Sequence, residues 1–415
     1  MASPGTCPGR LLDLTRLISR VGRGPMTGVD RVEHAYLTEF LAQPEPLFGL
    51  VATSAGQALL DRRGVAELAA RFGGQTHWGR PDLLARFSRS LGPARKAAEA
   101  DVRRLALGSA LPHRLARLLA RLPHGVAYYN VGHSNLTDLV LRTVKALPGA
   151  QVSVLIHDTI PLDYPQFTRD GQSSVFEAKL RRVSQSADRV IGNSAQTERD
   201  VVRHMTAMGR VPETLMAHLG VGGLQPAPLP ADYAALQPYF LTIGTIEPRK
   251  NHALLLDLWQ GFATKPPDGG IPHLLIAGSR GWKNDAVFAR LDALPANGPV
   301  RELRGADDRL VASLLQGAAG LLFPSHAEGF GLPPAEAAAL GIPVICNDLA
   351  VLHEVLGDYP VYAAISDGYH WIGAIETLVE NWRTGRTGWA DDRFEWRNKL
   401  PTWADHFNLV LKQAW

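Results

Sequence analysis

Two glutamates with seven residues between them stand in the stretch AEGFGLPPAEAAALG, residues 327–341. Glu328 lies among glycines, whereas Glu336 lies in an alanine-rich run that favours a helix. If a diphosphate lies at the start of that helix, the two acids flank it, and each can accept hydrogen bonds from sugar hydroxyls. The two glutamates are therefore suited to binding the two sugars of a nucleotide-sugar, one on each side of its diphosphate. The simpler interpretation, Glu336 as a favourable first-turn acid, leaves the glycines unexplained.

The residues between the two acids predict an anion site. Gly329 and Gly331 would let backbone N–H groups approach a ligand closely. Pro333 and Pro334 suit the first turn of a helix. The glycines thus precede a helix start, where free N–H groups and the helix dipole favour an anion.

Two adjacent cations, Arg249 and Lys250, follow a predicted buried strand in GTIEPRKNH, residues 244–252. Ligands of parallel sheets bind at the carboxyl ends of the strands, and a guanidinium beside an ammonium suits a diphosphate. The alternative is that both cations simply lie in a solvated loop near the start of a helix and bind nothing. Cations are unfavourable at that end of a helix, which favours the binding role.

A histidine ends another predicted strand. His157 lies near the end of QVSVLIHD, residues 151–158, and the loop DTIPLDYP that begins at Asp158 has the composition of a loop at a site. Asp158 could orient the imidazole or cap the loop. A strand-end histidine satisfied by its neighbours is the alternative, and both interpretations stay open. For His133 and His326 a structural role is the preferred interpretation.

The elements that must position these residues alternate between strand and helix. RLLDLTRLI is predicted as a strand, followed by a Gly-containing loop and the helix VDRVEHAYLTEFLAQ. Further strands and helices follow, and a second series runs from YFLTIGT to AVLHEVLG. Residues 221–237 are rich in Gly and Pro and predict an interdomain linker, and the tail from about 370 is predicted to be helical. Repeated alternation indicates parallel sheets covered by helices.

The length and composition of the chain are consistent with two α/β domains. A chain of 415 residues exceeds one ordinary core, so two domains are expected. Cys7 and Cys346 form neither a disulfide framework nor a metal-binding spacing, which favours a reducing compartment. There is no run of 18 apolar residues and no apolar leader at the start, so a cytoplasmic location is expected.

Charge is distributed unevenly along the chain. Residues 1–225 contain 28 Lys and Arg against 19 Asp and Glu, whereas residues 226–415 contain 15 against 21. Residues 112–125 predict a short basic amphipathic helix that carries Arg114, Arg117 and Arg121. The basic half could face an anionic acceptor or the inner face of a membrane, or its arginines could simply be solvated. No nucleic-acid-binding signature is present, so nucleic acid is not expected as a partner.

Several stretches resemble the retaining GT-B glycosyltransferases of family 4. The resemblance is carried by GTIEPRKNHALLLDLW, by LLIAGSRGWKND, and by the stretch from LRGADDRL to LHEVLGD. The family's pattern of two glutamates separated by seven residues is represented here by Glu328 and Glu336. The first half is more loosely similar in TGVDRVEHAYL, VLIHDTIPLDYP and SADRVIGNSAQTERDV, and residues 45–125 carry the least of the resemblance.

This resemblance implies an α/β architecture of the GT-B type, with two Rossmann-like domains facing across a cleft. Residues 1–225 would form the acceptor-binding domain and residues 226–394 the donor-binding domain. A helix at about 395–415 would pack back on the first domain. Two positions depart from the family: His353 stands where Pro is frequent, and YAAISD replaces the usual Asp-Pro pair. Both affect packing and the region near the donor, not the diphosphate contacts.

The resemblance also implies roles for individual residues. Arg249 and Lys250 would hold the donor diphosphate, and Glu336 would hold the ribose. Glu328 would hold the transferred sugar, and His157 would contact it. The remaining donor contacts would come from the loop at Gly28, the region of Arg304 near the base, and the backbone of Gly329, Phe330, Gly331 and Leu332.

The expected reaction is transfer of a hexose or deoxyhexose from a nucleotide diphosphate sugar, with retention at the anomeric carbon. We assign catalysis to Glu328, His157, Arg249 and Lys250, with no cofactor and no metal. GDP-mannose is the first expectation for the donor, and a glycan or lipid-linked hydroxyl in surface polysaccharide assembly is the expected acceptor. A non-catalytic sugar-nucleotide-binding scaffold and a GT-B sugar-nucleotide epimerase are the alternatives.

Overall fold

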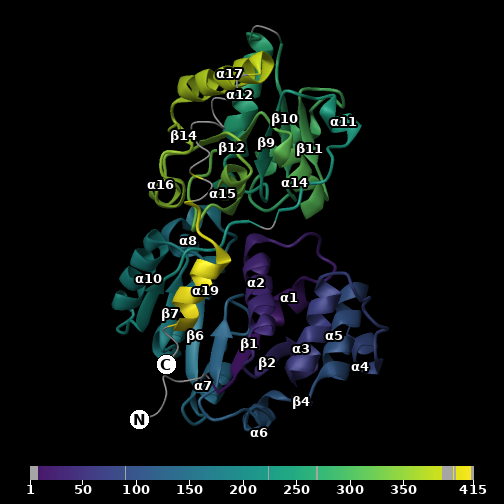
Figure 1. Cartoon of the computed structure of the whole chain (residues 1–415), viewed down its shortest axis with the longest axis vertical. Helices are drawn as coiled ribbons and strands as arrows, with labels where there is room; N and C mark the ends of the chain where they lie inside the picture. Colours follow the sequence, from purple (N-terminus) through teal and green to yellow (C-terminus); the bar gives the residue numbers. More distant parts are fainter. Residues whose placement is uncertain are drawn as a thin grey trace.

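The computed structural model describes residues 8–88, 90–222, 224–267, 270–385, 396 and 399–412. Two α/β units lie end to end along the longest axis of the molecule (Figure 1), each built around its own sheet. The predicted boundary at 225/226 falls after the last strand of the first sheet and before the first strand of the second.

The first sheet has eight strands in the order β4-β3-β2-β1-β5-β6-β7-β8. The strands from β2 through β1 to β8 pair in parallel, whereas β2–β3 and β3–β4 pair antiparallel. The strands are β1 (Arg10–Asp13), β2 (Leu47–Thr53), β3 (Gly56–Leu60), β4 (Gly108–Ala110), β5 (Ala127–Asn130), β6 (Gln151–Ile156), β7 (Arg189–Gly192) and β8 (Glu213–Met216).

Helices cover the first sheet and link its strands. They are α1 (Thr15–Arg20), α2 (Gly28–Ala42), α3 (Arg62–Phe72), α4 (Leu83–Phe87), α5 (Pro93–Leu105), α6 (Leu115–Leu119), α7 (Asp138–Lys145), α8 (Ile160–Asp163), α9 (Gln172–Ser186) and α10 (Ala195–Ala207). Short 3₁₀ turns η1 (Pro112–Arg114) and η2 (Pro165–Phe167) precede α6 and follow α8.

The second sheet has six parallel strands in the order β11-β10-β9-β12-β13-β14. They are β9 (Tyr239–Ile243), β10 (His273–Ala277), β11 (Val300–Leu303), β12 (Gly320–Phe323), β13 (Val344–Cys346) and β14 (Val361–Tyr362). The covering elements are α11 (Ala231–Ala234), η3 (Pro248–Lys250), α12 (His252–Thr264), α13 (Asp285–Asp292), α14 (Asp308–Gln316), α15 (Leu332–Ala339), α16 (Ala350–Leu356) and α17 (Gly368–Thr384). The strand order reverses between β9 and β12, where ligands of such sheets bind.

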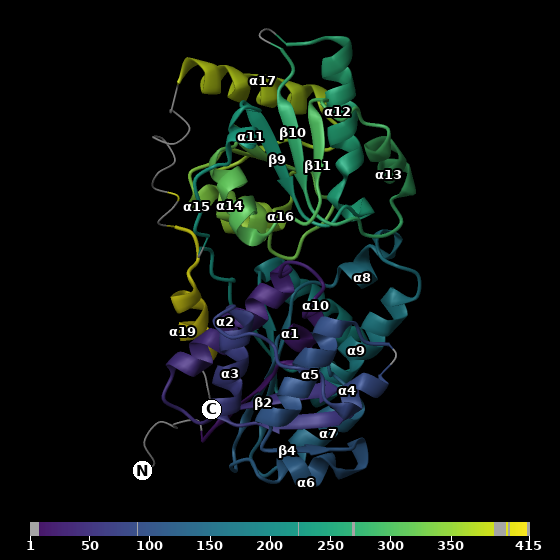
Figure 2. The ribbon, with the colours of Figure 1, turned by 90° about the vertical axis from the view of Figure 1, so that its right-hand side faces the viewer.

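The chain crosses between the two units twice, and the crossings lie together. The first crossing follows β8, and the second leads to α19 (Trp403–Lys412), which lies beside the first sheet in both ribbon views (Figures 1 and 2). Val221 N–H donates to the carbonyl of Pro401 at 2.8 Å, which joins the two crossings. The Tyr36 hydroxyl on α2 lies 2.8 Å from Nε2 of His406 on α19. The ends of the predicted helix, 413–415 and most of 395–398, lie outside the described residues.

Two predicted elements are shorter than expected. The strand predicted over RLLDLTRLI ends at Asp13, because the Asp13 side chain accepts a hydrogen bond from Thr15 N–H at 3.0 Å and the chain turns into α1. The helix predicted over 112–125 is a 3₁₀ turn followed by α6, which ends at Leu119. Pro123 lacks an N–H and disfavours a helical conformation at the residue before it.

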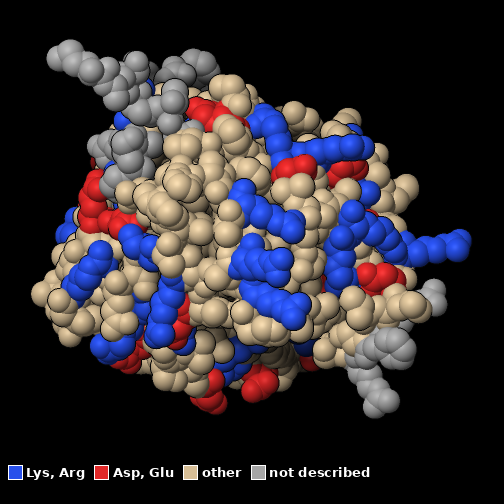
Figure 3. Space-filling model, turned by 90° about the horizontal axis from the view of Figure 1, so that it is seen from below, with Lys and Arg blue, Asp and Glu red and all other residues tan. Residues whose placement is uncertain are grey.

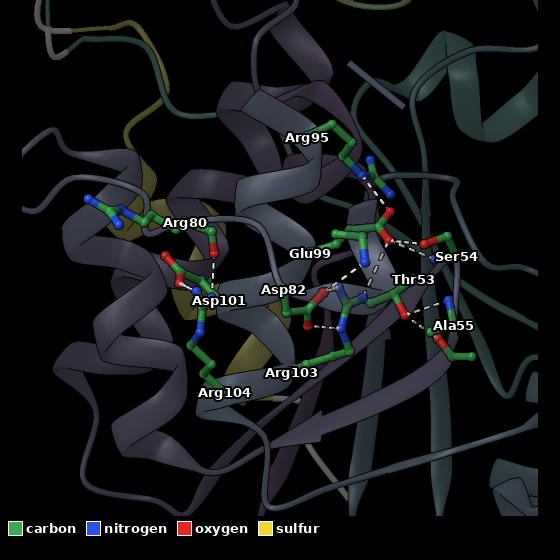
Figure 4. Close-up of polar contacts among 12 residues, drawn as sticks. Thr53, Ser54, Ala55, Arg80, Asp82, Arg95, Glu99, Asp101, Arg103 and Arg104 are labelled. Carbon is green, nitrogen blue, oxygen red and sulfur yellow. Dashed lines mark hydrogen bonds and ion pairs between the residues drawn. The ribbon is translucent and has the colours of Figure 1, made fainter. Parts of the chain in front are cut away.

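The arginine-rich helices α3 to α5 are held by ion pairs (Figure 4). Buried Glu99 accepts hydrogen bonds from the N–H and hydroxyl of Ser54 at 2.8 and 2.6 Å, and from Arg95 at 2.8 Å. Arg103 forms a bidentate pair with Asp82 at 2.7 Å for both contacts. Glu99 thus attaches α5 to the β2–β3 hairpin, and Arg103 attaches it to the start of α4.

Candidate functional site

A buried ion cluster lies where the loops after β9 and β12 meet. Nζ of Lys250 lies 2.7 Å from Oε1 of Glu328, and Nη1 of Arg249 lies 2.8 Å from the same oxygen. Arg249 also contacts Glu247 at 2.8 Å and donates to the carbonyl of Ala327 at 2.7 Å. The side chains of Arg249 and Lys250 are 18% and 11% exposed, so both cations are held in place while keeping some access to solvent.

The charged groups of this cluster shift one another's pKa values. Burial would raise the pKa of Glu328, but Arg249 and Lys250 outweigh it and lower that pKa to about 2. Burial would lower the pKa of Arg249, but Glu328, Glu247 and Asp158 raise it above its usual value. Burial lowers the pKa of Lys250, against the attraction of Glu328. The cluster therefore presents a permanent guanidinium and an ionised carboxylate at neutral pH, with the Lys250 amino group beside them.

The glycine-containing loop joins this cluster to the start of α15. Gly331 is the N-cap of α15 and has φ of 91°, a conformation that favours glycine. Gly329 lies against the first unit: a Cβ at this position would come within 2.1 Å of the His157 carbonyl oxygen. The Gly329 carbonyl accepts hydrogen bonds from the hydroxyls of Ser194 at 2.8 Å and Thr197 at 3.2 Å. The loop is thus positioned by the first unit as well as by its own strand.

Glu336 is engaged by a residue of the opposite unit. It lies within α15, is 5% exposed, and forms an ion pair with Arg31 of α2. Burial raises the pKa of Glu336, and Arg31 opposes this rise. The sequence separation is 305 residues, so no local pattern predicts this pair. A ribose held by Glu336 would therefore also lie close to Arg31.

The start of α2 is built to face α15. Gly28 opens α2, and a Cβ at Gly28 would lie 3.3 Å from Cδ1 of Leu332, the first residue of α15. Asp30 closes a capping box with Thr27, and Arg16 donates to Asp30 at 2.6 Å. The contacts of Asp30 fix the loop at Gly28 within the first unit, and this loop approaches the start of α15 in the second unit. Sequence reasoning identified Gly28 but missed Arg31 and the supporting Asp30.

His157 is nearly buried, being 7% exposed, and directly follows β6. Its Nε2 lies 2.7 Å from the Val131 carbonyl oxygen, so Nε2 carries the proton and donates. Burial lowers the pKa of His157 to about 4. Its imidazole is therefore neutral at pH 7 and leaves Nδ1 as an acceptor. Nε2 of His133 lies 2.8 Å from the Leu155 carbonyl oxygen, in keeping with the structural role preferred from the sequence.

Arg304 lies away from the ion cluster. It follows β11, and its side chain is 63% exposed, 2.8 Å from Glu302 and 3.6 Å from Asp292. Arg280 shares both acids, at 2.8 and 2.6 Å. The role of Arg304 near a base stays a prediction, and its side chain is already engaged by acids.

Phe330 contributes packing as well as backbone. Its ring is 4% exposed and lies 6.0 Å from that of His218, whose Nε2 is 2.7 Å from Glu354 on α16. Glu354 also accepts hydrogen bonds from the N–H groups of Ala195 at 2.6 Å and Gln196 at 3.3 Å, at the start of α10. This contact between the two units was not predicted from the sequence, because its parts lie far apart along the chain.

Among the described residues, no three His, Cys, Asp or Glu side chains lie together in a way that could hold a metal ion. None of the described helices is both long enough and apolar enough to cross a bilayer. Cys346 is free and buried, while Cys7 lies outside the described range.

A cavity of about 200 Å³ adjoins the ion cluster. Its walls come from the residues around α8, from α10, from the loop ending at Glu328, and from the start of α16. Both units thus contribute to it, and Glu328 belongs to both the cavity and the cluster.

Comparisons with known proteins agree with this geometry. Residues 90–407 match the family model described as family 4 glycosyltransferase in conflict systems. Over 287 residues the chain is 31% identical to the serotype-specific mannosyltransferase WbdA of Escherichia coli. That alignment covers 64% of this chain and 33% of WbdA, so the chain spans about a third of the length of this relative.

Solved structures share the fold at low sequence identity. HepE of Anabaena, solved in complex with UDP and glucose, aligns with a TM-score of 0.65 at 13% identity, over 98% of this chain and 99% of HepE. WaaG, a glycosyltransferase involved in lipopolysaccharide biosynthesis, aligns with a TM-score of 0.59 at 14% identity, over 98% of each chain. The predicted GT-B architecture is confirmed. Because the family model takes in strands of both sheets and the loop between Glu328 and Glu336, this chain belongs to the family 4 glycosyltransferases of conflict systems.

Proposed function

We propose that this protein transfers a hexose or deoxyhexose from a nucleotide diphosphate sugar to a hydroxyl of a glycan, with retention at the anomeric carbon. The observation that carries the proposal is the cluster of Arg249, Lys250 and Glu328 beside the start of α15. Two cations and a helix N-terminus stand where a diphosphate would gain charge as the sugar leaves. Placing such groups in advance is an efficient way to stabilise a developing anion.

Each residue then has a distinct task. Arg249 and Lys250 hold the diphosphate, and Glu336 accepts hydrogen bonds from the ribose. Glu328 and the backbone N–H groups of Gly329 to Leu332 hold the transferred sugar and the phosphate next to it. Neutral His157 accepts a hydrogen bond from a sugar hydroxyl through Nδ1. This division requires no metal, since the charge is met by side chains and the helix dipole.

The relatives support a role in polysaccharide assembly. WbdA is named as a mannosyltransferase, as is the O-antigen chain mannosyltransferase B of Escherichia coli, 31% identical over 186 residues. GDP-mannose is therefore the first donor to test, and an acceptor in surface polysaccharide assembly, free or lipid-linked, is the first acceptor class.

A donor-hydrolysis assay without acceptor tests the activity. We expect slow release of nucleoside diphosphate from one donor among GDP-mannose, UDP-hexoses and dTDP-rhamnose, and faster release when a glycan acceptor is added. Binding of a sugar nucleotide with no release under either condition would instead support a non-catalytic scaffold. Release of an epimerised sugar nucleotide would support an epimerase.

We also propose that the first unit contacts an anionic membrane surface, at the inner face in a cytoplasmic enzyme. Arg114, Arg117 and Arg121 are exposed around α6, whose leucines are buried. Leu107 and Leu111, beside them, are 45% and 55% exposed. Seen from this end of the molecule, Lys and Arg side chains gather over the face (Figure 3). Basic residues near an anionic leaflet contribute about 1 kcal/mol each.

Liposome co-sedimentation tests this contact. We expect binding to anionic vesicles at low salt, release at high salt, and weaker binding when Arg114, Arg117 and Arg121 are all changed to Ser. Protein that stays in the supernatant with anionic vesicles at low salt would refute the contact and leave the transferase proposal intact.

A further inference from the structure

One ion pair of the candidate site joins a carboxylate of the second unit to a cation of the first. Arg31 of α2 donates through Nη2 to Oε1 of Glu336 on α15. The Arg31 side chain is 31% exposed and that of Glu336 is 6% exposed, so the pair is open to solvent from the Arg31 side. Within the described residues, Oε2 of Glu336 enters no hydrogen bond, and it can accept one from a ligand.

This pair lies one turn inside two helices whose first residues meet. α2 reaches the junction of the two units in both ribbon views (Figures 1 and 2), and a Cβ at its first residue, Gly28, would lie 3.3 Å from Cδ1 of Leu332, the first residue of α15. Arg31 and Glu336 each stand about one helical turn further along, a rise of roughly 5.4 Å. The proposed diphosphate lies at the start of α15, and the ribose of a donor is bonded directly to that diphosphate. The ribose therefore reaches the pair of Arg31 and Glu336.

Glu336 depends on Arg31 for its charge. Burial raises the pKa of Glu336, and the negative charge of Asp308, in the first turn of α14, adds to that rise. Arg31 is the cation that opposes both effects and favours the ionised carboxylate. An ionised carboxylate accepts hydrogen bonds at both oxygens, whereas a protonated one gives up part of that capacity. The ability of Glu336 to bind sugar hydroxyls is therefore supported from the opposite unit.

Two opposite effects of Arg31 on a ribose are conceivable, because Arg31 and the ribose hydroxyls would use the same carboxylate. Arg31 occupies Oε1, while a carboxylate has about four lone-pair sites in all, so acceptor sites remain for the ribose. Removing the cation would leave a nearly buried carboxylate without its counter-charge, which is unfavourable. Both considerations make Arg31 a support for the ribose contact and not a competitor for it.

We infer that Arg31 is a positioning residue for the donor: it holds Glu336 for the ribose, so that both units bind the nucleoside half of the donor. The inference rests on the proposed transferase function. A site that is built to accept hydrogen bonds from substrate hydroxyls discriminates against an analogue that lacks one of them. The donor is therefore a ribonucleotide sugar, and a 2′-deoxyribonucleotide sugar such as dTDP-rhamnose is bound less tightly.

Calorimetric titration of the full chain with GDP, UDP and dTDP tests this role without any turnover. GDP or UDP should bind more tightly than dTDP, and the 2′-deoxy form of that ribonucleotide should bind more weakly than its parent. Arg31→Ala should weaken binding of the ribonucleotide about tenfold, the order expected for losing a charge-assisted hydrogen bond, and should reduce its advantage over the 2′-deoxy form. Arg31→Lys should restore part of the affinity.

A matched control removes a comparable ion pair elsewhere in the first unit. Arg104 on α5 is partly exposed and pairs with nearly buried Asp101 at 2.6 Å (Figure 4). Arg104→Ala should leave nucleotide affinity as in the unsubstituted protein. If thermal unfolding shows that Arg31→Ala does not fold, Arg31→Gln, which keeps most of the side-chain volume, gives the same comparison.

A double-variant cycle separates this role from a direct contact of Arg31 with the diphosphate. In the Glu336→Gln background, Arg31→Ala should weaken ribonucleotide binding only slightly, because the carboxylate that Arg31 serves is gone. With an active donor, Arg31→Ala should raise the donor KM more than it lowers kcat.

Several results would overturn the inference. They are additive losses of affinity in the double variant, tighter nucleotide binding by Arg31→Ala, equal binding of a ribonucleotide and its 2′-deoxy form by the unsubstituted protein, and binding of dTDP alone. If none of the three nucleotides binds, the proposed function fails as well. If the expected binding pattern is found but no donor is turned over, the role of Arg31 stands and only the transferase proposal fails.

Discussion

At the scale of single residues, one carboxylate organises the charge of the site. Glu328 lies within 2.8 Å of both Arg249 and Lys250, and its ionised state is stabilised by them. The Arg249 and Lys250 side chains are thus held in a fixed orientation in a nearly buried place. A diphosphate arriving beside them meets groups that need little rearrangement, which is the condition for strong stabilisation of a leaving anion.

Removing either cation should therefore impair transfer strongly. Arg249→Ala and Lys250→Ala each lose a contact that strengthens as the diphosphate departs, so we expect a cost of about 2–4 kcal/mol in kcat/KM. Steady-state kinetics with the active donor measures this. Lys145→Ala is a matched control, because Lys145 pairs with Asp188 on the surface at 2.7 Å. Near-normal turnover in both site variants would contradict the assignment.

The two glutamates should separate binding from turnover. Glu336→Gln should mainly weaken donor binding, because a ribose is remote from the bond that breaks. Glu328→Gln should mainly lower kcat, because it alters contacts to the reacting sugar and removes the charge that Arg249 and Lys250 share. Calorimetric titration with the sugar nucleotide, together with kcat, distinguishes these effects. The opposite pattern would refute the division of roles.

At the scale of elements, α19 is attached to the first unit through a buried histidine. Nδ1 of His406 lies 2.9 Å from the His218 carbonyl oxygen, so Nδ1 carries the proton and Nε2 accepts from the Tyr36 hydroxyl. Both ring nitrogens are used in the neutral form. Burial lowers the pKa of His406 to about 4, against the hydrogen bond to His218.

This histidine predicts a pH dependence of stability. An unfolded histidine has a pKa near 6.5, so the unfolded chain takes up a proton at His406 before the folded chain does. Neutral His406 makes its full contribution to the free energy of unfolding above about pH 6.5. That contribution is lost as the pH falls toward 4, and the total loss is about 3 kcal/mol. The thermal midpoint of His406→Gln should lie below that of the unsubstituted protein at pH 7.5, and the gap should narrow toward pH 4.5.

A surface histidine provides the control for this prediction. His113 lies in the exposed turn before α6. The thermal midpoint of His113→Gln should equal that of the unsubstituted protein at both pH values. If the difference in thermal midpoint between His406→Gln and the unsubstituted protein stays constant from pH 7.5 to 4.5, protonation of His406 is not linked to unfolding.

At the scale of the whole molecule, the proposed site needs both units. The second supplies Arg249, Lys250 and the start of α15, while the first supplies Arg31, His157 and the hydroxyls that hold the glycine-containing loop. The contacts of Glu354 with the start of α10 fasten the units on another side. In the proposed function, charge stabilisation thus depends on how the two units pack.

Transfer should therefore survive chelation. We expect the rate in excess EDTA to match the untreated rate, because Arg249, Lys250 and the helix start supply the positive charge. Activity lost in EDTA and restored by Mg²⁺ or Mn²⁺ would show that a metal carries part of it.

The sequence alone determined the features that depend on nearby residues. The alternating strands and helices, the cations after β9 and the turn into α15 were predictable from the sequence. They depend on the spacing of apolar residues and on the positions of glycine and proline, which are local signals that span only a few residues. Even there the strand at Arg10 was predicted too long, because an Asp13 side-chain contact was not visible in the apolar pattern.

Only the tertiary structure decided which distant groups meet. The pairing of Arg31 with Glu336 joins positions 305 residues apart, and the stack of Phe167 on His326 joins the two units. The ion pair of Arg103 with Asp82 likewise joins α5 to the start of α4 across 21 residues of sequence. Such contacts follow from how sheets and units pack against each other, and packing brings together residues whose separation along the chain carries no periodic signal.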